Sequence, residues 1–140
     1  MSHRRFLMAV ACALTIGGTA CSDDDPVSPA DISGAYTATS FRVITNGTTT
    51  DILQAGGTVT LQLTPSGTTT GAIHVPPVAG QPAFDADLSG TWFVLANGSV
   101  RLQHSADTFL RDMDLVADDE QLIGDRLFGA VEIQIELTKN

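Results

Sequence analysis

The fold of this chain is decided by two stretches, TVTLQLT at residues 58–64 and AVEIQIELT at residues 130–138. Both alternate polar and apolar residues strictly, which is typical of a strand with one face on a core and the other in water. No segment shows a sustained 3.6-residue period with caps, so we expect an all-β domain with little helix. Further strands are expected at 34–45, 68–75, 90–96, 98–104, 109–116 and 120–124, and 50–55 shows the pattern less clearly.

Turn residues separate the expected strands. Asn46-Gly47 and Asn97-Gly98 are pairs that a two-residue hairpin favours, because both central residues take positive φ. Each pair also begins an N-glycosylation acceptor pattern, but we interpret both as turns. Other turns are expected at Gly56-Gly57, at Pro65-Ser66-Gly67 and at residues 117–120.

A short sequence occurs twice, as DISGAY at residues 31–36 and as DLSGTW at residues 87–92. Each copy is followed by a strand, a hairpin turn and a second strand, TVTLQL in one case and SVRLQH in the other. The echo indicates either a half-barrel repeat or two strands that merely start alike. In both cases, a glycine two residues before a large aromatic suggests a strand that enters the core at a crowded end.

These Gly-x-Tyr and Gly-x-Trp strand starts, about eight short antiparallel strands and consecutive hairpins resemble the lipocalin-like domain of bacterial lipoproteins, over residues 31–140. The resemblance implies an antiparallel up-and-down barrel, which removes exposed sheet edges by closing on itself. Eight strands leave room for packed side chains or one small ligand. The chain is shorter than an ordinary lipocalin and its best match, Gly90-Thr91-Trp92, lies mid-chain, so a β-sandwich is the alternative.

The first twenty residues predict export. Two arginines at positions 4 and 5 precede an uncharged, mainly apolar stretch at residues 6–16, and small residues follow at 17–20. This stretch is shorter than the roughly 20 apolar residues of a membrane-spanning helix. We therefore interpret residues 1–20 as a lipoprotein signal peptide.

Cys21 follows this signal directly. Thr19-Ala20-Cys21 resembles the end of the bacterial lipobox, although Gly18 stands where a branched aliphatic residue is usual. We interpret Cys21 as the lipid-modified anchor at the cell envelope, at the outer membrane; the alternative is an ordinary signal that leaves a free thiol. Because Cys12 leaves with the signal, the mature chain has no internal disulfide.

Residues 21–30 are acidic and proline-rich, and predict an extended tether. The whole chain has a net charge of −9, and loss of the two signal arginines takes it to −11. Such a chain repels phosphate backbones, which excludes nucleic acid as a partner. The β domain then spans residues 31–140.

Candidate metal and catalytic residues are few. His74, His104 and Asp107 could approach one another, but two histidines on separate strands are weak metal spacing. The acidic hairpin around residues 112–120 lacks the spacing of a calcium loop, and we interpret it as a solvated turn. Familiar catalytic motifs do not occur, so we expect no enzyme and no cofactor.

Arg111 is a cation among apolar residues, since it shares the strand parity of Phe109 and Met113. Related barrels often lay an arginine over the aromatic ring of the Gly-x-Trp strand, so the resemblance implies a cation–π contact with Trp92. The alternative is that Arg111 reaches water near a strand end. The candidate ligand-binding residues are therefore Trp92, Phe109, Arg111 and Met113.

Two functions remain open for a monomeric domain of this kind. We expect a binding or protein-interaction module of the envelope, acting through loops such as residues 75–84; the alternative is a carrier of a small hydrophobic ligand in the barrel interior. An open apolar cavity of about 300 Å³ or more would favour the carrier, and a filled interior would favour the interaction module. Short strands and about 110 residues lead us to expect a filled interior, because protein cores pack densely.

Overall fold

The computed structural model describes residues 27–78, 80–118 and 120–140. The expected signal peptide, Cys21 and most of the expected tether lie outside this described part of the chain. Among the described residues, no helix has the length and apolar character that crossing a membrane would require.

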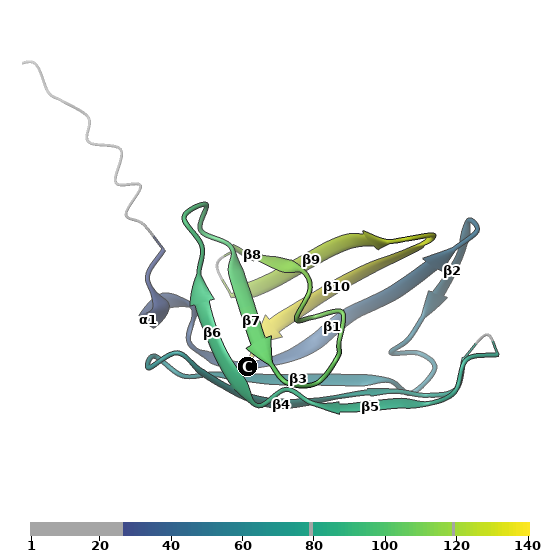
Figure 1. Cartoon of the computed structure of the whole chain (residues 1–140), viewed down its shortest axis with the longest axis horizontal. Coiled ribbons are helices and arrows are strands. Elements are labelled where there is room, and N and C mark those ends of the chain that lie inside the picture. Colours follow the sequence, from purple (N-terminus) through teal and green to yellow (C-terminus); the bar gives the residue numbers. More distant parts are fainter. Residues whose placement is uncertain (1–26, 79, 119) are drawn as a thin grey trace, which may run out of the picture.

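One short helix and ten strands follow one another along the described chain (Figure 1). The helix α1 spans Pro29–Ile32, at the end of the expected tether. The strands are β1 (Gly34–Thr45), β2 (Thr48–Asp51), β3 (Thr58–Leu63), β4 (Thr68–Val75), β5 (Phe84–Asp87), β6 (Gly90–Val94), β7 (Val100–His104), β8 (Asp114–Asp118), β9 (Gln121–Phe128) and β10 (Val131–Lys139).

Eight of these strands form a closed antiparallel barrel in which each strand pairs with the next along the chain. The barrel closes where β10 pairs with β1, in a ladder that runs from Tyr36–Lys139 to Thr45–Val131. The two extra strands are β2, which pairs with the second half of β1, and β5, which pairs with β4. The expected all-β, up-and-down barrel is confirmed, and the β-sandwich alternative is not adopted.

Two expectations about the strands are wrong. The expected strand at 109–116 begins only at Asp114, because residues 108–112 form turns: Arg111 N–H donates to Thr108 O and Asp112 N–H donates to Phe109 O. β5 was not expected, because its first residue follows a proline-rich stretch. It continues the register of the β4–β6 ladder, so β5 and β6 behave as one bent strand along β4.

The interior next to α1 is filled by leucines. Tyr36 and Trp92, 2% and 4% exposed, close this end of the core. Their polar atoms are satisfied, since the Tyr36 hydroxyl donates to Ile32 O at 2.5 Å and the Trp92 indole N–H donates to Thr64 O at 2.9 Å. The leucines that fill this part of the barrel, each no more than 2% exposed, are Leu61, Leu63, Leu102, Leu115, Leu122 and Leu137.

The sequence echo corresponds to a structural repeat. Tyr36 lies opposite Leu61 in the β1–β3 ladder, and Trp92 lies opposite Leu102 in the β6–β7 ladder. The residues two positions earlier also match: Gly34 faces Leu63, as Gly90 faces His104. A Cβ atom at position 90 would lie 2.1 Å from Gln103 O, so this strand start requires glycine.

Candidate functional site

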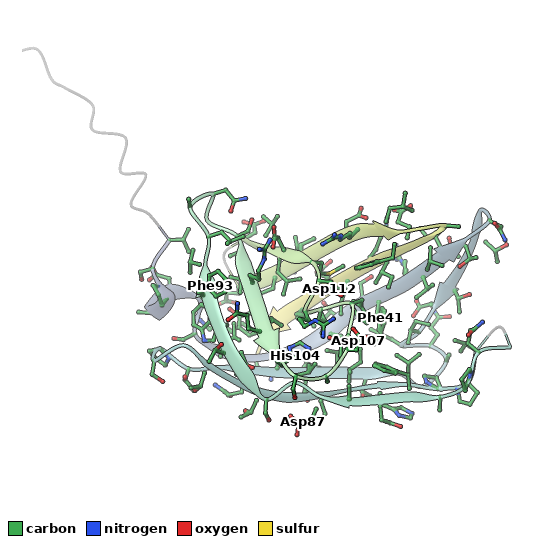
Figure 2. All side chains as sticks on the ribbon, viewed as in Figure 1. Phe41, Asp87, Phe93, His104, Asp107 and Asp112 are labelled. Carbon is green, nitrogen blue, oxygen red and sulfur yellow. The ribbon has the colours of Figure 1, made fainter. Side chains whose placement is uncertain are left out.

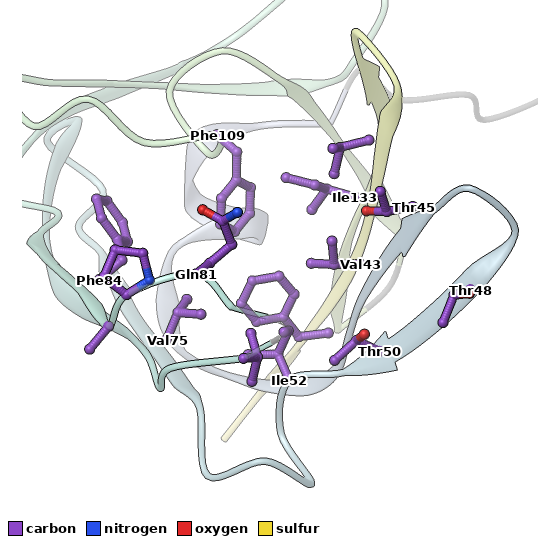
Figure 3. Close-up of a pocket in the computed structure, with 15 residues that line it drawn as sticks. Val43, Thr45, Thr48, Thr50, Ile52, Val75, Gln81, Phe84, Phe109 and Ile133 are labelled. Carbon is purple, nitrogen blue, oxygen red and sulfur yellow. The ribbon is translucent and has the colours of Figure 1, made fainter.

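The barrel contains a pocket (Figure 3). It is lined by β2 and by the parts of β1, β4, β5 and β10 that lie at the end of the barrel away from α1; Figure 1 shows the arrangement of these strands. Its volume is about 820 Å³, and the fifteen described residues that line it come from β1, β2, β4, β5, β10 and the segment 78–83, together with Ile52 after β2 and Phe109. Figure 3 shows Val43 and Ile133 on one side of the space and Val75 and Phe84 on the other. None of the lining side chains is ionisable.

A β-bulge in β1 turns the pocket residues inward. The register with β10 shifts between Ala38 and Ser40, so the alternation of side chains changes by one residue. Tyr36 faces the core before the bulge, and Phe41 and Val43 face the interior after it. One twelve-residue strand therefore supplies both the filled end and the pocket wall.

The floor of the pocket is made of Phe41 and Ile52, each 1% exposed. The turn that follows β2 holds Ile52 in place: Ile52 N–H donates to Phe41 O at 2.9 Å, and Gly57 N–H donates to Ile52 O at 2.8 Å. A Cβ atom at position 57 would lie 2.4 Å from Ile52 Cγ2, so Gly57 permits this close packing. The Phe109 ring lies 5.2 Å from the Phe41 ring, centroid to centroid, and extends the floor.

The segment between β7 and β8 reaches the site through Phe109, which lines the pocket. Asp107 and Asp112 of this segment are labelled in Figure 2. The segment is anchored by the fully buried Leu110 and by a 2.7 Å hydrogen bond between His104 Nε2 and Thr108 Oγ1. Among the described residues, His104 Nδ1 has no hydrogen-bond partner. Burial and then the positive charge of Arg111 lower the pKa of His104. The hydrogen bond between His104 and Thr108 holds the residue next to Phe109, which lines the pocket.

The proline-rich segment after β4 forms another side. Gln81 N–H donates to Val78 O at 2.8 Å, which closes a small turn over the pocket. Val78, Gln81 and Pro82 line the space together with Phe84 of β5. The stretch that the sequence marked as an apolar loop is thus a wall of the cavity.

The four residues predicted to bind ligand are not brought together. Phe109 lines the pocket, whereas Met113 is buried in the core, where its Sδ atom occupies the space beside Gly124. Trp92 is buried with its indole N–H bonded to Thr64 O. Arg111 is a partly buried residue of the turn region and contacts Asp107 and Asp112.

The predicted stacking of Arg111 on Trp92 is wrong. The parity argument assumed a strand at 109–116, but Arg111 lies in a turn, where two neighbouring carboxylates hold its guanidinium. Their hydrogen bonds and charges also raise the pKa of Arg111, with Asp112 contributing most. A cation–π contact occurs elsewhere, between Arg126 and Phe128, with 5.3 Å from the guanidinium carbon to the ring centroid.

The structure also separates the two histidines. His74 lies on the outer face of β4, where its Nδ1 atom is 2.5 Å from Asp85 Oδ1, while His104 faces the interior. In the part of the chain that the structure describes, no three histidine, cysteine or acidic side chains gather as a metal site would require. Arg101 and Arg111 neutralise Asp114 and Asp112 of the acidic segment.

Sequence reasoning identified only some of the pocket residues. Val131 and Ile133 were expected to face inward from the alternation in 130–138, and both line the pocket. β2 at Thr48–Asp51 consists of polar residues only, so alternation gave no signal for it, and the less clear expectation at 50–55 overlaps it by two residues. The bulge in β1 has no sequence signature, so the parity of Phe41 and Val43 could not be assigned in advance.

Comparison of the chain with protein-family models, with curated proteins and with solved structures found no match. The chemistry of the site therefore rests on its geometry.

Proposed function

We propose that this chain is a lipid-anchored lipoprotein of the cell envelope, whose lipocalin-like barrel binds a small hydrophobic molecule in its open-end pocket. The anchor rests on the export signal at residues 1–20 and on Cys21, and the expected location is the outer membrane. The lipocalin-like character is supported by the eight-stranded up-and-down barrel and by the buried aromatics of its two Gly-x-Tyr/Trp strand starts. The function is binding, without catalysis.

The observation that carries this proposal is the cavity itself. Its volume of about 820 Å³ lies within the range of about 300–1,000 Å³ that is usual for small-molecule sites. The interior was expected to be filled throughout, but only the part next to α1 is. The open end has an apolar wall that water solvates poorly, so transfer of an apolar ligand into it is favourable.

The lining also indicates the kind of ligand. Apolar side chains dominate it, and its polar atoms belong to threonines of β1 and β2 and to Gln81. These neutral groups can accept or donate single hydrogen bonds and so orient a ligand. The lining offers no ionisable side chain for general acid–base catalysis, which supports binding over turnover.

A titration with an environment-sensitive fatty-acid probe tests the proposal. The full chain carrying Cys21→Ser is the background, because its own acyl chains then cannot enter the pocket. We expect saturable, one-to-one binding. Ile133→Trp places a larger side chain in the pocket and should weaken binding of the probe at least tenfold, or about 1.4 kcal/mol.

The matched control is Ile123→Trp, which makes the same substitution on the neighbouring strand. Ile123 is 37% exposed on the outer face, so this change should leave the affinity for the probe unaltered. Absence of saturable binding, or equal weakening by both substitutions, would contradict the proposed function.

A protein-interaction module is the second candidate. The observation in its favour is a group of exposed apolar side chains on the outer face of β8 and β9: Val116, Ile123 and Leu127, which are 56%, 37% and 65% exposed. An envelope protein would be the partner of such a face. Val116→Asp should then abolish the interaction and leave probe binding intact. The group is small, and the pocket supports ligand binding better.

A further inference from the structure

Arg126 lies beside the pocket, on the inner face of β9. Leu122 of that strand is fully buried, and a Cβ atom at position 124 would meet Met113 Sδ at 2.5 Å, so both positions face the interior. Since side chains alternate along a strand, Arg126 faces the same side. Its partner in the β9–β10 ladder is Ile133, which lines the pocket. Residues opposite each other in this way have Cβ atoms about 4.5–5.5 Å apart.

Arg126 is exposed, and its guanidinium contacts an aromatic ring instead of a carboxylate of the described residues. It lies over the Phe128 ring, and among the described residues no acidic group lies within 4.0 Å of it. Arg101 and Arg111, in contrast, are each bonded to aspartates. Arg126 adds to the lowering of the pKa of Asp112, after the larger effect of Arg111. Its positive field therefore reaches that carboxylate without an ion pair.

We propose that Arg126 binds the anionic head group of an amphiphile whose apolar chain occupies the pocket. This inference rests on the proposed function. A guanidinium presents planar donors that match a carboxylate or a phosphate in a bidentate arrangement. Stacking on Phe128 fixes the guanidinium plane and leaves its edges free to donate. The uncharged pocket then binds the apolar chain of the ligand, and Arg126, beside Ile133, binds its head group.

The test compares three probes with one chain length and different heads: oleate, oleyl phosphate and oleyl alcohol. Binding is measured at pH 8, where both acidic heads are ionised, in the full chain carrying Cys21→Ser. We expect the anions to bind roughly three- to tenfold more tightly than the alcohol, the range of an exposed ion pair or slightly more. Arg126→Gln should remove this preference and leave the affinity for the alcohol unchanged.

The matched control is Arg42→Gln, which removes the same charge from the outer face of β1, between the inward Phe41 and Val43. It should keep the preference for anions. Which of the two anions binds more tightly identifies the head group.

Other results overturn the inference in distinguishable ways. If the alcohol and the anions bind equally to the unsubstituted background, the pocket is confirmed and the role of Arg126 is wrong. The role of Arg126 is also wrong if Arg126→Gln weakens the binding of all three probes equally, because this indicates an effect on packing. It is wrong, too, if Arg42→Gln reduces the preference for anions as much as Arg126→Gln does, because this indicates an effect of net charge. If none of the three probes binds saturably, the proposed function itself fails.

Discussion

At the scale of single residues, His104 marks a difference in chemistry between the two halves of the barrel. It occupies the position that Leu63 occupies in the first half, since each lies opposite the glycine that starts its partner strand. His104 is 8% exposed and hydrogen-bonded to Thr108. An imidazole thus stands where the repeat has a leucine, and it connects the core to the segment that carries Phe109.

This position predicts a pH dependence of stability. Burial lowers the pKa of His104 in the folded chain, whereas in the unfolded chain the group protonates near pH 6.5. The unfolded state therefore binds the proton more readily, and the free energy of unfolding decreases as the pH falls from about 6.5 to the lower pKa of the folded state. Urea unfolding followed at a series of pH values measures this loss.

His104→Leu provides the control, because it installs the side chain of the equivalent position. It should remove the loss of stability in that pH range. Asp31, Asp87 and Asp112 have lowered pKa values, so their contribution is lost only below about pH 4. A loss near pH 6 that persists in His104→Leu would show that another group causes it.

At the scale of elements, the sequence predicted the strands that have one polar face, and failed where the chain bends. Strict alternation located β3 and β10, and Asn46-Gly47 gave the hairpin between β1 and β2, with φ of 52° and 77°. β5 was not predicted, because a proline-rich segment precedes it. Arg111 was wrongly assigned to a strand. Residues 109–113 lie in turns with Leu110 and Met113 buried, and in the sequence this spacing resembles the alternation of a strand.

β8 is the most weakly held strand of the barrel. Two residue pairs connect it to β7 and three to β9, whereas β6 has two with β4 and five with β7, and nine connect β1 to β10. Few backbone hydrogen bonds mean a low free energy of local opening. We predict that the amide protons of β8 exchange with solvent at least tenfold faster than those of β10, a difference of about 1.4 kcal/mol. Hydrogen exchange at each amide measures this.

The same measurement has an internal comparison in β3 and β4, which share six residue pairs. Their amides should exchange at rates close to those of β10. Equal protection of β8 and β10 would show that the narrow β7–β8 contact does not limit the closure of the barrel.

At the scale of the whole molecule, the barrel has two different ends. α1, at the end of the expected tether, lies at the filled end of the barrel (Figure 1). The residues that line the pocket lie at the other end. β1 connects them, from Gly34 next to α1 to Thr45 in the pocket wall. If the chain is anchored through Cys21, the pocket is carried at the end of the barrel away from the attachment point.

The proposed lipid anchor at Cys21 predicts a change of location. Cys21→Ser removes the thiol that acylation requires, so the protein should pass from the membrane fraction to the soluble fraction after detergent-free lysis. Two acyl chains give stable anchoring, so without them nearly all of the protein should leave the membrane fraction. Retention of the variant in the membrane fraction would contradict the lipoprotein assignment.

The central claim is that the open end of the barrel holds an apolar ligand, and methyl NMR tests it most directly. Oleate is added to the Cys21→Ser chain, and contacts between ligand and protein methyl groups are recorded as intermolecular NOEs. We predict NOEs to Val43, Val75 and Ile133 of the pocket, and none to Leu63 or Leu102 of the filled end. NOEs confined to the exposed Val116 and Leu127, or no NOEs with saturating ligand, would contradict the account.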